Sequence, residues 1–99
     1  MRELFHPGAD QLCLSAVLNA LGDPIRLQIL KNLAGKSETT CASCNIDLPK
    51  SALSHHFKVL REAGLINARI EGKQRFLSIR YDDLEKRFPG LIHSIIKSI

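Results

Sequence analysis

Apolar residues recur three and four positions apart over most of this chain, and that spacing predicts a mainly helical protein. A first helix is expected over residues 10–21. A second begins at Pro24, because proline is tolerated at the first helical position, and it ends before Gly35. The pattern then weakens, and residues 41–46 can form only a short helix. The first half of the chain therefore holds two clear helices and one short one.

The segment Pro49–Ala63 has one apolar face and one polar face. Leu53, Phe57 and Leu60 lie on the apolar face, and Gly64 ends the helix in a left-handed conformation. The polar face carries Lys50, Ser51, Ser54, His55, Lys58 and Arg61. Short polar side chains suit base edges in a major groove, whereas lysine and arginine suit phosphates. The pattern indicates a DNA recognition helix, and the alternative is a solvated helix face with a positive bias.

Two segments rich in β-forming residues follow, Leu65–Ile70 and Arg75–Tyr81, and they predict a β-hairpin. The cations near its tip are Arg69, Lys73 and Arg75. They could lie along phosphates or reach a minor groove, although a charged tip can also serve to keep a sheet edge soluble. Because a short helix and a longer helix come directly before the hairpin, the order is typical of a winged helix-turn-helix.

Helical spacing returns from Asp82 to the end of the chain. We expect Phe88-Pro89 to divide this segment, since the residue before a proline avoids the α conformation. Its apolar stripe could close over the core of the same chain. A dimer contact made together with the first helix is favoured, because DNA readers of this size usually pair to read two half-sites. The residues expected at this contact are Leu14, Val17, Leu18, Leu84, Phe88, Leu91, Ile92 and Ile95.

Length and charge narrow the class of protein. The 99 residues suffice for a single domain, spanning residues 1–99, with dimerisation helices at both ends. The net charge is +4 and the pI is about 9.2. From Lys50 to Arg80 there are seven lysines and arginines and two glutamates, a net +5, so the rest of the chain sums to −1. A basic patch on a nearly neutral body favours a nucleic-acid partner.

Several other classes are excluded. The start of the chain lacks the apolar run of a signal peptide, and no segment approaches the roughly 18 apolar residues of a membrane span, so we expect a cytoplasmic protein without membrane contact. An enzyme is not expected, because no acid–base pair, nucleophile constellation or glycine-rich phosphate loop appears. A winged-helix module for protein contacts is the rival, but its docking face would show aromatic anchors, and most of the five aromatic residues fall on core faces.

The three cysteines leave several hypotheses open. An odd count argues against a disulfide framework. Cys41 and Cys44 would share one face of a short helix, and Cys13 could add a third thiolate for a soft metal or metalloid ion. The pair could also act as a redox switch. Small buried hydrophobic residues are the favoured interpretation, and no cofactor is required.

Three segments resemble the ArsR/SmtB family of winged-helix repressors: Leu18–Leu30, Ser51–Ile66 and Glu71–Phe76. The resemblance extends from about residue 12 onward. It implies a homodimeric repressor of transcription that binds a palindromic operator in double-stranded DNA and is released by an effector. The implied fold is mainly α with a small β-hairpin, in the order of four helices, two strands and one or two closing helices.

The same resemblance assigns individual positions. The groove-facing residues would be Lys50, Ser51, Ser54 and His55, with Lys73 and Arg75 on the wing. His56 falls at a position that faces inward in this family. The effector stays open, because arsenic-sensing members carry Cys-Val-Cys where this chain has Cys41-x-x-Cys44. Zinc-sensing members use paired Asp and His on the last helix, a spacing that the closing segment does not reproduce.

Overall fold

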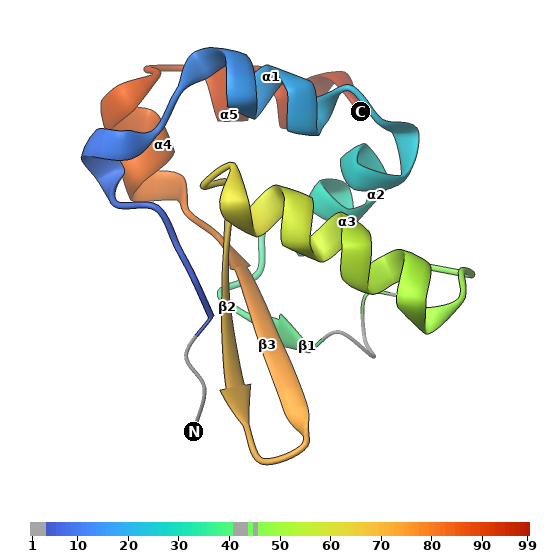
Figure 1. Ribbon diagram of the computed structural model, residues 1–99. Helices are drawn as coiled ribbons and strands as arrows, with labels where there is room; N and C mark the ends of the chain where they lie inside the picture. The colour runs from blue at the N-terminus through green and yellow to red at the C-terminus, as the bar shows by residue number, and fades with distance from the viewer. Residues whose placement is uncertain (1–3, 41–43, 45) are drawn as a thin grey trace.

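The chain folds as a set of short helices beside a small antiparallel sheet, in a computed structural model that describes residues 4–40, 44 and 46–99. In order, the elements are η1 (Ala9–Gln11), α1 (Leu14–Leu21), α2 (Pro24–Leu33), β1 (Thr39–Thr40), α3 (Lys50–Glu62), β2 (Ile66–Glu71), β3 (Gln74–Ile79), α4 (Tyr81–Arg87) and α5 (Leu91–Ser98). Figure 1 shows α1 and α5 at one end of the molecule and the tip of the β2–β3 hairpin at the other. Within the described parts of the chain, no helix is both long and apolar enough to cross a membrane.

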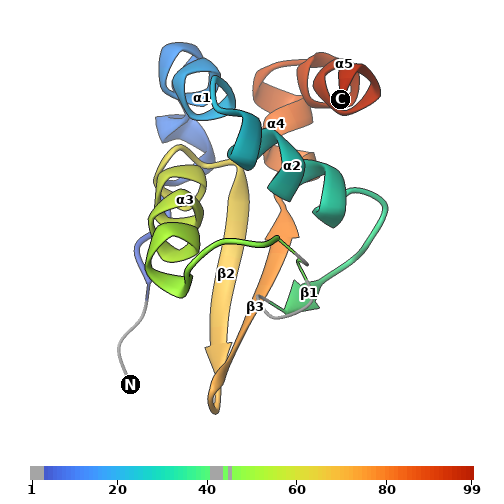
Figure 2. The ribbon, with the colours of Figure 1, turned by 90° about the vertical axis from the view of Figure 1, so that its right-hand side faces the viewer.

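The sheet confirms the predicted hairpin and adds an edge strand to it. β2 and β3 pair antiparallel, from Ile66 opposite Ile79 to Glu71 opposite Gln74, so the connecting turn has only two residues. Gly72 occupies the first of them with a φ of +63°, which suits a tight hairpin. β1 pairs with the free edge of β3, as Figure 2 shows. The sequence did not reveal β1, because two residues are too few to show a period of two.

Several predicted boundaries were wrong. The helix expected over residues 10–21 is broken, since Leu12 and Cys13 have extended backbone and separate η1 from α1. This break turns the Leu12 side chain into the core. Pro49 caps α3 instead of starting it. The closing segment does divide after α4, and α5 begins after Gly90. Most of the short helix predicted at residues 41–46 lies outside the described residues.

The core joins every layer of the fold. α2 contributes Ile29, Leu30 and Leu33, while α3 contributes Phe57 and Leu60. The same cluster contains residues of the hairpin and of the helices at both ends of the chain: Val17, Ile66, Leu77, Ile79, Leu84 and Ile92. Because a single cluster is shared, the orientation of α3 is tied to the helices and to the sheet at once.

Arg26 adds a polar link between three helices. Its Nε donates to the Ala20 carbonyl at the end of α1 (2.5 Å), and its Nη1 lies 3.4 Å from Nδ1 of His56 on α3. Asp23 caps α2 by accepting from the amides of Ile25 and Arg26. His56 is half-buried, in agreement with its expected inward position.

The segment before α1 runs against the end of α3 and the hairpin. The Ala68 amide donates to Nε2 of His6 (3.0 Å), and Nη1 of Arg80 donates to the Pro7 carbonyl (2.8 Å). Gly64, which has a φ of +86°, lies directly under Leu12 and Pro7. A methyl group at this position would collide with the Leu12 side chain. Gly64 is therefore required by its conformation and by this close packing.

Two glycine substitutions separate these requirements. Gly35→Ala should lose about 1–2 kcal/mol of unfolding free energy, since Gly35 has a φ of +78° but open space around it. Gly64→Ala should lose about 1–3 kcal/mol more unfolding free energy than Gly35→Ala, because the added methyl group also overpacks the core. Urea unfolding of the two variants measures the difference. Equal losses would mean that Leu12 and Pro7 give way freely.

Candidate nucleic-acid interface

The exposed side of α3 carries most of the polar residues singled out in the sequence. Burial of Phe57 and Leu60 in the core forces the opposite face of the helix outward. The exposed members of that face are Lys50, Ser51, Ser54, His55 and Lys58. Glu62, near the end of the helix, is its sole acidic residue. The face therefore presents hydrogen-bonding and positive groups over its first two turns.

Arg61 has a different environment from the other members of this set. It is half-buried, and its Nε donates to the Phe5 carbonyl at 3.0 Å. This bond joins the last turn of α3 to the segment before α1. No local pattern indicates this contact, because 56 residues separate its two partners in the chain.

Arg69 on the hairpin is held by two carboxylates, Glu38 just before β1 and Glu71 at the end of β2. Its Nε and Nη2 donate to the two oxygens of Glu38, at 2.7 and 2.9 Å, and its Nη1 donates to Glu71. The guanidinium also lies over the ring of Phe76, 4.4 Å from the ring centre. The hydrogen bond from Arg69 lowers the pKa of Glu38, and the same contact raises the pKa of Arg69. The charge of Arg69 is therefore largely offset where it stands.

Lys73 and Arg75 present their charges differently. Both are exposed near the hairpin turn, and no ion pair joins either of them to a carboxylate among the described residues. Of the three predicted wing cations, all exposed, these two differ from Arg69 in that no carboxylate among the described residues offsets their charge. The sequence does not distinguish them from Arg69, because the carboxylate that pairs with Arg69 belongs to Glu38, 31 residues earlier in the chain.

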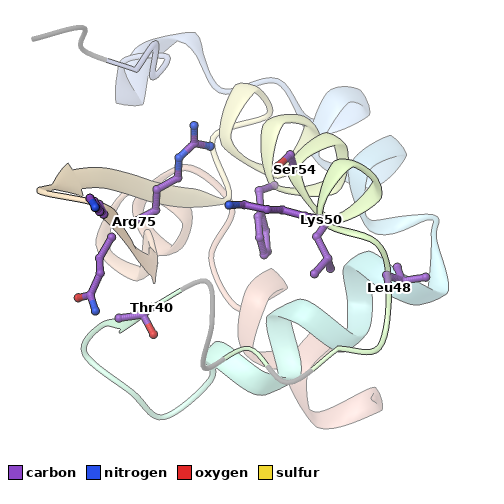
Figure 3. Close-up of a pocket in the computed structure, with 9 residues that line it drawn as sticks. Thr40, Leu48, Lys50, Ser54 and Arg75 are labelled. Atoms are coloured by element: carbon purple, nitrogen blue, oxygen red, sulfur yellow. The ribbon is translucent and has the colours of Figure 1, made fainter.

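The hairpin and α3 enclose a groove of about 580 Å³ between them. It is lined by Thr40, Leu48, Lys50, Leu53, Ser54, Phe57, Lys73, Gln74 and Arg75. In Figure 3, Lys50 and Ser54 lie on the side of α3 and Arg75 on the side of the hairpin, while Thr40 lies on the β1 segment and Leu48 just before α3. Predicted contact residues from two separate segments thus meet at one opening. Thr40, Leu48 and Gln74 were not foreseen as part of this site.

The proposed dimer residues divide into three groups. Val17, Leu84 and Ile92 are buried within this chain's own core, and Phe88, Leu91 and Ile95 are half-buried. Leu14 and Leu18 of α1 are each 47% exposed. Together with Phe5, they are the large apolar side chains that stay open to solvent among the described residues. Figure 2 shows α1 and α5 at the end of the molecule away from the hairpin tip.

The cysteine hypotheses remain untested. Cys41 lies outside the described residues, and Cys44 is buried. Cys13 is exposed at the start of α1, where a hydrogen bond with the Ser15 hydroxyl (3.1 Å) and nearby backbone amides lower the pKa of its thiol. In the part of the chain that the structure describes, no three His, Cys, Asp or Glu side chains are grouped to hold a metal ion.

Comparison with known proteins places this arrangement in a family. Residues 23–68, from the cap of α2 into β2, match the bacterial regulatory protein, arsR family. YceK of Bacillus subtilis (strain 168), an HTH-type transcriptional regulator, is 34% identical over 93 residues, which cover 88% of this chain and 90% of YceK. An HTH-type transcriptional regulator of Methanocaldococcus jannaschii is 38% identical over 82 residues, covering 80% of this chain and 90% of that protein.

A solved structure shares the fold. The crystal structure of an ArsR family transcriptional regulator matches with a TM-score of 0.68 at 19% identity, over 96% of this chain and 99% of that one. The family match and the two relatives confirm the resemblance to ArsR proteins seen in the sequence, and this structure confirms the fold. The exclusion of enzymes agrees with it, since these relatives are regulators of transcription. The chain belongs to the ArsR family of helix-turn-helix transcriptional regulators.

Proposed function

We propose that this regulator binds double-stranded DNA with α3 in a major groove and the hairpin turn along the neighbouring phosphates or in the minor groove. The observation that supports this most directly is the placement of Lys50, Ser54, Lys73 and Arg75 around one opening, where none of the lining residues that the structure describes is a carboxylate. A surface with this charge is suited to two adjacent stretches of phosphate backbone.

The side chains divide by role. Ser51, Ser54 and His55 are short hydrogen-bonding groups in the first turns of α3, and we assign them to base edges. The phosphate contacts are assigned to Lys50, Lys58, Lys73 and Arg75. Arg61 and Arg69 add positive charge nearby, while their hydrogen bonds hold the Phe5 and Glu38 segments in place. These two arginines therefore act mainly through structure.

The functional unit in this proposal is a homodimer that represses transcription in the cytoplasm. Leu14 and Leu18 on α1 supply exposed apolar surface, and Phe88, Leu91 and Ile95 supply half-buried surface near α5. A two-fold contact at this end leaves both hairpin tips free, so that two copies read a palindromic operator. Occupation of an operator that overlaps a promoter excludes polymerase, and an effector that binds the DNA-free form relieves the repression.

Separate substitutions should distinguish base reading from phosphate binding. Ser54→Ala and His55→Ala should each reduce the free energy of binding to the DNA upstream of the protein's own gene by about 1–3 kcal/mol. Their effect on binding to random DNA should be small. Arg75→Ala should weaken binding to both DNAs alike and lower the slope of log affinity against log salt concentration by about one. Gel-shift titrations over a range of salt measure this, with Lys86→Ala on α4 as a distant control. Equal losses on both DNAs for every variant would remove the base-reading role of α3.

The dimer contact can be tested without disturbing the core. Leu14→Lys combined with Leu18→Lys should give a folded monomer, because both side chains are exposed in the single chain and charges would be buried only in the dimer. Sedimentation and circular dichroism report size and fold. Phe5→Lys is the matched control, since Phe5 is 59% exposed but lies outside α1. A double variant that sediments as a dimer would refute this interface.

The Arg69 pairs predict a gain of function. Glu38→Gln removes one carboxylate from Arg69 and should raise DNA affinity at low salt with a steeper salt dependence. Glu85→Gln changes the net charge equally on α4 and should have a smaller effect. Fluorescence anisotropy with a random duplex measures both. Identical gains from the two variants would show that only net charge matters.

A further inference from the structure

The groove between α3 and the hairpin has an apolar interior that phosphate binding does not require. Leu48, Leu53 and Phe57 line it on one side, and Phe57 is a residue of the hydrophobic core. Lys50, Lys73 and Arg75 contribute positive charge around the same space. Nucleic acid would use the charged groups and leave the apolar wall unused.

The size and chemistry of the groove restrict what can occupy it. Its volume of about 580 Å³ is within the range of roughly 300–1,000 Å³ common for small-molecule sites. Among the lining residues that the structure describes there is no Cys, His, Asp or Glu, so these side chains do not form a metal site. They also include no negative charge to receive a cation. An organic anion with an apolar body fits both halves of the lining.

We propose that this groove binds a small carboxylate carrying an aromatic ring or aliphatic chain, and that its binding displaces DNA. The carboxylate accepts hydrogen bonds from the guanidinium of Arg75 and from the lysine ammonium groups, an arrangement that suits a two-oxygen anion. The apolar body packs against Leu48, Leu53 and Phe57. This inference rests on the proposed DNA contact only for its regulatory consequence, since ligand binding itself needs no DNA.

Competition follows from shared residues. Lys50, Ser54 and Arg75 line the groove and are also assigned to DNA, so one site cannot serve both partners at once. By linkage, a carboxylate that weakens DNA binding by some factor must itself be weakened by DNA to the same extent. This is a direct block at the reading surface, and it needs no change of conformation.

The probe for the test is 2-naphthoate, with the uncharged 2-naphthalenemethanol as its matched control. Amide chemical shifts of the folded protein should move around Ser54 and Gln74 with 2-naphthoate and much less with the alcohol at constant ionic strength. Lys50→Gln should lower the affinity for 2-naphthoate by about threefold or more. Lys58→Gln, a matched change on the same helix but outside the groove, should leave that affinity unchanged while reducing DNA affinity.

A second variant fills the space instead of removing charge. Leu48→Trp places an indole ring at the groove and should abolish the 2-naphthoate shifts. Circular dichroism checks that this variant folds. Lys50→Gln tests the site independently. In the wild type, 2-naphthoate should also release bound DNA in an anisotropy assay. Absence of 2-naphthoate shifts, or shifts that persist equally in Lys50→Gln and Leu48→Trp, would overturn the ligand site. Ligand binding without any DNA binding would overturn the proposed function and leave this site standing.

Discussion

The burial of one side of α3 determines what the rest of the molecule can do. Phe57 and Leu60 enter a core shared with α2 and the hairpin, so the helix cannot rotate without exposing them. A fully buried leucine or phenylalanine contributes about 1.5–3 kcal/mol, which is a large share of the stability of a small domain. Exposing Phe57 and Leu60 would lose this free energy, so the helix is held in one orientation. Its polar residues face outward for that reason.

Polar contacts refine this arrangement at the middle of α3 and at its last turn. Arg26 joins the end of α1 to His56, and Arg61 joins the last turn of α3 to the Phe5 carbonyl. Glu38 and Arg69 connect the chain next to β1 with the hairpin. Each contact relates segments that are distant in sequence. Together they position the helix and the hairpin so that an open, positively charged groove remains between them.

Local patterning was sufficient to predict much of the fold. The helical period located α2 and α3 to within a residue or two, and two segments rich in β-forming residues located the hairpin. It could not predict β1, which is two residues long, or the break at Leu12, which depends on core packing. The pairing of Arg69 and the half-burial of Arg61 were equally out of reach. Both depend on partners that only the folded chain brings close.

The central claim is that α3 and the hairpin turn form the DNA-reading surface. Amide chemical-shift mapping on titration with the duplex upstream of the protein's own gene tests it most directly. The account predicts the largest changes over residues 50–58 and 73–75, with small changes in α4. Changes concentrated on α4 and α5, with α3 and the hairpin turn unaffected, would contradict it.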